Sequence, residues 1–127
     1  MKAKKILSSI LALCMLLSMM SICAFAAETL VATPENVASV IASAKAGDTV
    51  VLSEGTYSPI SVIEKNITLV GEVSESGELL AEIVGGDPAI VGHRFTGTIK
   101  NIKITNAFRG FFGEPCKDIV FDGLYIT

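Results

Sequence analysis

The sequence has little cysteine, and the positions of its cysteines leave few uses for them. There are three cysteines among 127 residues, and Cys14 and Cys23 lie in an apolar N-terminal stretch. If that stretch is removed, Cys116 is the only one left, so neither an internal disulfide nor a cysteine-based metal site can form. We expect Cys116 to be a small buried hydrophobic residue, and the fold to depend on its core for stability.

The chain is also short of positive charge and of common catalytic motifs. Without its first 26 residues it has seven basic and thirteen acidic residues, a net charge of −6. This balance argues against nucleic acid or an anionic membrane surface as partners. The sequence contains no phosphate-cradling glycine loop, nucleophile elbow or histidine-rich metal motif. No cofactor is indicated.

The N-terminus has the three parts of a secretory signal peptide. Three lysines lie within the first five residues, an apolar stretch covers 6–22, and a small-x-small cleavage site occupies 24–26. An uncleaved membrane anchor is less favoured, because the apolar run falls short of the ~20 residues that span a bilayer. We therefore predict that residues 1–26 are a signal peptide and that the protein is secreted or at the cell surface. Membrane contact would occur only through this segment before cleavage.

A short amphipathic helix is predicted after an extended segment at 28–32. Thr33 is a candidate N-cap, and Pro34 fits the first helical position. Lys45 suits the last turn, and Gly47 supplies a left-handed stop. About three turns are expected, and such a helix can cover the first coil of a solenoid. The apolar stripe consists of Val37, Val40, Ile41 and Ala44.

Short β-branched runs follow this helix, separated by Gly, Asn, Asp, Pro or Ser. No Asn-Gly or Asp-Gly pair lies at hairpin spacing between two alternating strands, and Asp122-Gly123 is interpreted as a coil corner. The polar stretch 73–79 predicts a loop that projects from a corner. Strands are expected near 49–52, 59–63, 67–70, 81–84, 88–91, 99–105, 109–112, 118–121 and 124–127.

Internal repetition indicates that these strands coil. The segment 101–105 recurs as 123–127, and 66–70 precedes 101–105 by 35 residues, which is two short turns or one turn plus the polar loop. A coil of about twenty residues would hold three strands, with successive coils about 4.8 Å apart. The predicted inward residues are Ile102, Ile104, Leu124 and Ile126, and the predicted corner residues are Asn66, Asn101 and Asn106.

These features resemble the N-terminal start of right-handed parallel β-helix proteins of the pectin-lyase-like superfamily. The resemblance rests on the helix, AGDTVVL at 46–52, GTY at 55–57 and KNITLVG at 65–71. It implies an all-β fold: a right-handed, single-stranded parallel β-helix of about three coils with a short N-terminal capping α-helix. Residues 27–127 would be the N-terminal part of this domain.

We expect this part to be truncated, because the chain stops inside a predicted strand with no polar cap. The alternative is a small solenoid closed by a partner or by self-association.

The superfamily spans pectate lyases, polygalacturonases, other polysaccharide lyases and hydrolases, epimerases, adhesins and phage tailspikes, so it specifies function weakly. The resemblance implies a protein that binds or degrades extracellular polysaccharide, with this piece mainly a scaffold and inactive alone. The alternative is a non-catalytic adhesion module that binds glycan or protein. Catalytic residues are unknown, no metal ligands are assigned, and calcium would belong to further coils.

The charged candidates at predicted corners have two interpretations. Arg94, beside the single histidine His93, could act as a base or clamp a sugar carboxylate, although we favour a solvated corner. Asp118 and Asp122 would lie about 13 Å apart along one strand, too far for a carboxylate pair within a coil. Glu114 is the only other acid nearby, so we expect these residues to be corner residues too.

Two further groups remain as candidates. Phe108, Phe111 and Phe112 with Arg109 could form an aromatic platform for a sugar ring. Because 109–112 is a predicted strand, at least one of these phenylalanines should fill the core instead. The second group could bind calcium loosely, but its spacing matches no rigid ligand set, so we expect a solvated projection. It consists of Glu72, Glu75, Glu78 and Glu82.

Overall fold

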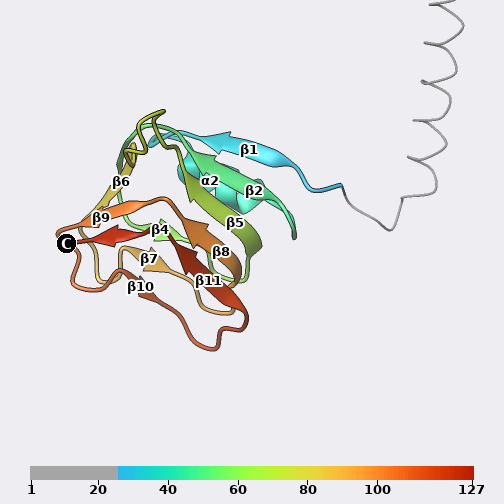
Figure 1. Ribbon diagram of the computed structural model, residues 1–127. Helices are drawn as coiled ribbons and strands as arrows, with labels where there is room; N and C mark the ends of the chain where they lie inside the picture. The colour runs from blue at the N-terminus through green and yellow to red at the C-terminus, as the bar shows by residue number, and fades with distance from the viewer. Residues whose placement is uncertain (1–25) are drawn as a thin grey trace, which may run out of the picture.

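The computed structural model describes residues 26–127 (Figure 1). The predicted signal peptide, 1–26, lies outside the described residues except for its last position. The described part is a parallel β-solenoid of about four turns, with twelve strands and one short helix. The predicted all-β parallel β-helix is therefore confirmed, with about four turns rather than three. Within 26–127 no helix has the length and apolarity needed to cross a bilayer.

The largest sheet, sheet A, holds five parallel strands in the order β1-β2-β5-β8-β11. Figure 1 shows its strands stacked side by side. Every pair within it is parallel, as expected when each turn adds one strand to the same sheet. The strands are β1 Thr29–Ala32, β2 Thr49–Leu52, β5 Asn66–Gly71, β8 Thr96–Lys100 and β11 Ile119–Asp122.

Two smaller parallel sheets complete the turns. Sheet B has the order β12-β9-β6-β3, and sheet C has the order β10-β7-β4. Sheet B consists of β3 Gly55–Tyr57, β6 Ala81–Val84, β9 Lys103–Thr105 and β12 Tyr125–Ile126. Sheet C consists of β4 Ile60–Ser61, β7 Ile90–Val91 and β10 Phe111–Phe112. Each full turn therefore visits the three sheets once, which confirms three strands per coil.

The turns are unequal in length. Thr49 pairs with Thr68, Thr68 with Thr98 and Thr98 with Val120, which gives turns of 19, 30 and 22 residues. The predicted 22-residue repeat is confirmed. The spacing of 35 residues between 66–70 and 101–105 is not a strand pairing, because Asn66 pairs with Thr96. The turn between them has 30 residues, since it contains the loop at 73–79. That loop is closed by an antiparallel bridge between Val73 and Leu79.

Alternate side chains fill one continuous core. Ile102 and Ile104 are fully buried, as predicted. Leu124 is half-buried, and Ile126 lies in register with Ile104 but is 55% exposed. Inward orientation therefore gives burial only where another turn or the helix covers the residue. The largest fully buried side chains include Tyr57, Phe95, Leu52, Leu69, Ile83 and Ile99.

Several predicted strand boundaries were wrong. The expected strand at 99–105 is divided into β8 and β9 by Asn101, whose φ of 56° forms a corner. Asn106, with φ 55°, is a corner residue as predicted, whereas Asn66 is the first residue of β5. The GTY segment at 55–57 forms a strand that the alternation did not indicate.

The helix, α2 (Val37–Ser43), is shorter than predicted, with seven residues. Asn36 rather than Thr33 is the N-cap, and its Oδ1 accepts a hydrogen bond from the Thr33 N–H at 2.7 Å, which closes a turn before the helix. Ala44 is extended, so the helix ends before Gly47 is reached. The predicted helix of three turns is therefore too long at both ends. A turn closed by Asn36 replaces its start, and the extended Ala44 replaces its end.

Two charged side chains fasten this helical end of the solenoid. Lys65 Nζ, from the next turn, donates to the carbonyls of Ala42 and Ala44 at 3.0 and 2.9 Å, the interaction we had expected Lys45 to provide. Asp48 accepts hydrogen bonds from the backbone N–H groups of Glu28 (2.9 Å) and Lys45 (2.8 Å). These bonds hold the pKa of Asp48 below its ordinary value of 3.8.

Candidate functional site

The outer face of sheet C brings together several of the predicted candidate residues, which are half-buried or exposed. Ser61, Val91 and Phe112 lie in register on adjacent strands, and their neighbours Ile60, Ile90 and Phe111 point into the core. Strand alternation thus places Phe112 outside and Phe111 inside. Phe111 contacts the rings of Phe95 and Phe121, with centroids 6.3 and 5.2 Å away.

Phe112 is the centre of a small cluster drawn from two turns, which we call the Phe112 cluster: Asp87, His93, Arg109 and Phe112. Arg109 Cζ lies 4.5 Å from the centroid of the Phe112 ring, a cation–π contact. The His93 ring meets Phe112 edge-on at 5.6 Å. The Arg109 Nε donates to Asp87 Oδ1 at 2.5 Å. The guanidinium is thereby fixed over the ring, and within residues 26–127 its terminal nitrogens make no further side-chain hydrogen bond.

His93 is held in place by the next turn. Its Nδ1 accepts a hydrogen bond from the Glu114 N–H at 3.1 Å and lies 3.0 Å from the Glu114 carbonyl oxygen. Arg94 forms an exposed ion pair with Glu64, and both have positive φ, at 54° and 60°. The expectation of a solvated corner therefore holds for Arg94, whereas His93 belongs to the cluster.

The side chains of this cluster can contact an anionic group through Arg109 and an apolar surface through Phe112. A guanidinium with free terminal N–H groups can bind a carboxylate in bidentate fashion, and Asp87 orients it through Nε. The ring of Phe112 is not a free platform on both faces, because Arg109 covers one of them. Phe108 is 83% exposed in the loop before β10. The three phenylalanines therefore form no common platform, and the expectation that at least one of them fills the core is confirmed for Phe111.

The acidic candidates are not gathered into one site. Asp118 sits at a corner with φ 52°, and Asp122 lies in register with Lys100 on the outside of sheet A. Glu72 accepts a hydrogen bond from the Glu54 N–H, and Glu82 accepts one from the Thr105 hydroxyl. Over residues 26–127, no three His, Cys, Asp or Glu side chains are grouped so that they could hold a metal ion.

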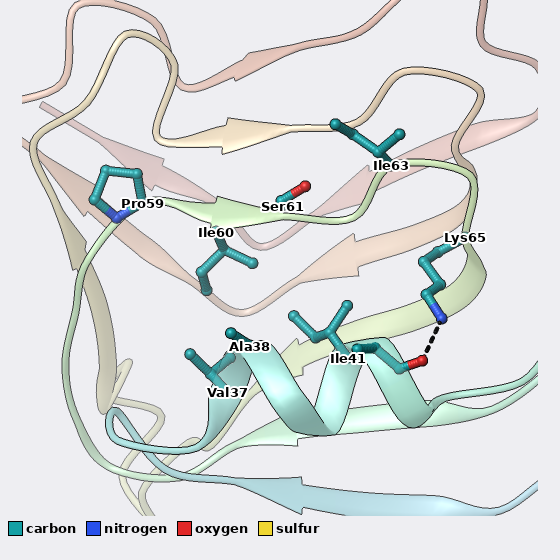
Figure 2. A pocket seen from close by; sticks show the side chains of 9 residues that line it. Val37, Ala38, Ile41, Pro59, Ile60, Ser61, Ile63 and Lys65 are labelled. Atoms are coloured by element: carbon teal, nitrogen blue, oxygen red, sulfur yellow. Dashed lines mark hydrogen bonds between the residues drawn. The ribbon is translucent and has the colours of Figure 1, made fainter.

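A groove of about 370 Å³ adjoins the same face between α2 and β4. Figure 2 shows Val37 and Ile41 of the helix opposite Ile60 of the strand, with Lys65 at one end. The α2 helix occupies the place that a strand before β4 would take in sheet C, and the groove is what the round helix leaves open. Sequence analysis missed it because it depends on packing between segments about twenty residues apart.

Cys116 is half-buried, and its Sγ donates to the Gly92 carbonyl at 3.0 Å. It therefore packs against the preceding turn, close to the expected role of a small core residue.

The fold and this face define a parallel β-solenoid whose sheet C carries the Phe112 cluster on its outer side. No protein-family model, curated protein or solved structure matches the chain. Its function must therefore be argued from its own residues.

Proposed function

We propose that this chain is an exported, pectin-lyase-like β-helix segment that binds extracellular polysaccharide along the outer face of sheet C. The observation that carries the proposal is the Phe112 cluster, in which Arg109 lies fixed over Phe112 beside His93. Sugar rings offer C–H groups to the faces of aromatic rings, and uronic acids offer carboxylates to guanidinium groups. The ligand class that fits is an acidic polysaccharide that places one carboxylate at Arg109, because the net charge of −6 confines its attraction to this local cation.

The strip is long enough for a chain rather than a single sugar. Strands β4, β7 and β10 are stacked about 4.8 Å apart, so the face from Ser61 to Phe112 extends about 10 Å along the solenoid axis. The groove beside α2 continues this face at its far end. A polymer lying parallel to the axis would contact Arg109 at one end and the groove at the other.

Binding to polygalacturonate tests the proposal, with its fully methyl-esterified form as the uncharged control. Protein comprising residues 27–127 should bind the acid polymer more tightly, and Arg109→Gln should weaken binding about tenfold, the effect of losing one charge-assisted contact. Lys103→Gln, a cation on sheet B, is the matched control and should have no effect. Equal binding of both polymers, or an unchanged affinity of Arg109→Gln, would refute the proposal.

The proposed role of this segment is binding and scaffold, with chemical cleavage assigned to none of its residues. Incubation of the same protein with polygalacturonate should release neither unsaturated products nor new reducing ends. Binding without turnover also fits the adhesion module. Product formation would assign catalysis to the described residues and contradict a purely binding role.

A further inference from the structure

His93 is the single histidine of the chain, and its ring is held at the edge of the Phe112 ring. It follows β7, whereas Phe112 ends β10 and Glu114 comes just after it, so the ring contacts residues of the next turn. The two rings are nearly perpendicular, at 85°, with centroids 5.6 Å apart. Packing and hydrogen bonding together therefore fix where the imidazole lies.

The partners of His93 Nδ1 suit both charge states of the ring. This nitrogen lies 3.1 Å from the backbone nitrogen of Glu114 and 3.0 Å from the carbonyl oxygen of the same residue. A neutral imidazole with its proton on Nε2 accepts from that N–H, whereas an imidazolium donates from Nδ1 to that carbonyl. The ring can therefore take up a proton and keep its place, because one residue supplies a partner for each state.

The charged groups around His93 cancel one another. Four are acidic and four are basic on the turns 62–65, 92–95 and 113–118 and in the Phe112 cluster. Such groups ordinarily keep their charge between about pH 5.5 and 7.5, where an imidazole changes its own. One proton on His93 therefore takes the local net charge from zero to +1. The eight residues are Glu64, Lys65, Asp87, Arg94, Arg109, Glu114, Lys117 and Asp118.

We propose that protonated His93 is a second cationic contact of the Phe112 cluster, which strengthens its hold on a polysaccharide carboxylate in mildly acidic solution. The inference rests on the proposed function and adds a residue to the same site. Arg109 Cζ lies 4.5 Å and the His93 ring 5.6 Å from the centroid of the Phe112 ring. The two cations are thus at most about 10 Å apart, which is about one Debye length in 0.1 M salt, so they act on the same stretch of a polyanion.

The affinity of residues 27–127 for polygalacturonate, measured by calorimetry at pH 7.5 and pH 5.5 and constant ionic strength, tests the inference. The polymer carboxylates stay ionised at both pH values. Wild-type protein should bind about fivefold more tightly at pH 5.5, the effect of one added exposed charge pair. His93→Asn keeps an acceptor near the Nδ1 position but takes up no proton, so its affinity should be equal at both. Lys117→Gln, a neighbouring cation, is the matched control and should retain the wild-type pH dependence.

Proton NMR of the single histidine provides a second readout on the unaltered protein. The imidazole signals should change to those of the protonated form at a higher pH when polygalacturonate is bound, because protonation and binding strengthen each other reciprocally. A purely structural role of His93 would leave this transition where it is in the free protein. Circular dichroism of His93→Asn establishes that the variant is folded.

The outcomes separate this inference from the proposed function. Binding at pH 7.5 that is no tighter at pH 5.5 would overturn the inference and leave the proposed function standing. A His93→Asn variant with the wild-type pH dependence would also overturn it, because another group would then be responsible. Absence of binding at both pH values would overturn the two together.

Discussion

The first and last described turns of the solenoid have the same internal register but differ in what covers them within residues 26–127. At the first end, α2 packs Ile41 onto the core and Ala44 follows just after the helix, and these residues are 3% and 6% exposed. At the last end, Phe121 and Ile126 occupy inward positions and remain about half exposed. The comparison shows that in a stacked fold the alternation along a strand decides whether a side chain points inward or outward. Whether an inward side chain is buried depends on the turn or helix that covers it.

The ends differ in polar fastening too. Lys65 binds the carbonyls at the end of α2, and Asp48 joins the entry of β1 to the segment after the helix. The backbone groups freed by ending a helix and starting a strand are thus satisfied by side chains from the next turn. The first end is therefore a built cap, and its parts can be removed one at a time.

The largest difference between the ends should appear with matched isoleucines. Ile41→Ala removes a fully covered side chain and should lower the free energy of unfolding by about 3 kcal/mol. Ile126→Ala removes one that is already 55% exposed, so it should lower this free energy by about 1 kcal/mol or less. Urea denaturation at low protein concentration measures both. Equal losses would mean that the ends are equally covered.

The next largest effect should come from Asp48→Asn. The two N–H bonds to the carboxylate lower the pKa of Asp48, so the folded state favours its ionised form. This stabilisation is complete above the unfolded-state pKa near 3.8, and it is lost as the pH falls through the lower folded-state pKa. The variant should melt at a lower temperature than the wild type at neutral pH. As the pH falls below about 4, the variant should lose less stability than the wild type does. Parallel melting curves from pH 7 to pH 2 would contradict this role.

A smaller effect is expected from Lys65→Met, which keeps the apolar stem but removes both bonds to the α2 carbonyls. The free energy of unfolding should fall by about 1 kcal/mol. Lys117→Met, at an exposed lysine, is the control and should change it by less than about 0.5 kcal/mol. An unchanged unfolding free energy for Lys65→Met would show that water caps the helix equally well.

The fold could be predicted from the sequence because short β-branched strands without hairpin turns have few ways to bury their side chains. The inward residues Ile102 and Ile104 followed from alternation alone. The unequal turn lengths did not, because the loop at 73–79 is inserted into one turn and shifts the apparent repeat. The cap also could not be predicted, since Lys65 reaches α2 from the next turn and sequence periodicity does not encode contacts between turns.

The candidate site was predicted in part. Alternation correctly required one of Phe111 and Phe112 to point inward. The partnership of Phe112 with His93 depends on which residues of the preceding turn lie beside it, and this follows from the register. Of the charged pairs, Arg109 with Asp87 and Arg94 with Glu64 are likewise contacts between turns. The two pairs are 22 and 30 positions apart, because the loop at 73–79 lengthens one turn, so no single spacing in the sequence reveals both.

Amide hydrogen exchange of a protein comprising residues 27–127, followed by mass spectrometry, tests most directly that burial in this fold depends on a covering layer. The account predicts slow exchange in β2 and β5, which lie between the first and later turns. In β11 and β12, which no described residue covers, it predicts fast exchange. Slow exchange of β11 and β12, or fast exchange of β2 and β5, would contradict it.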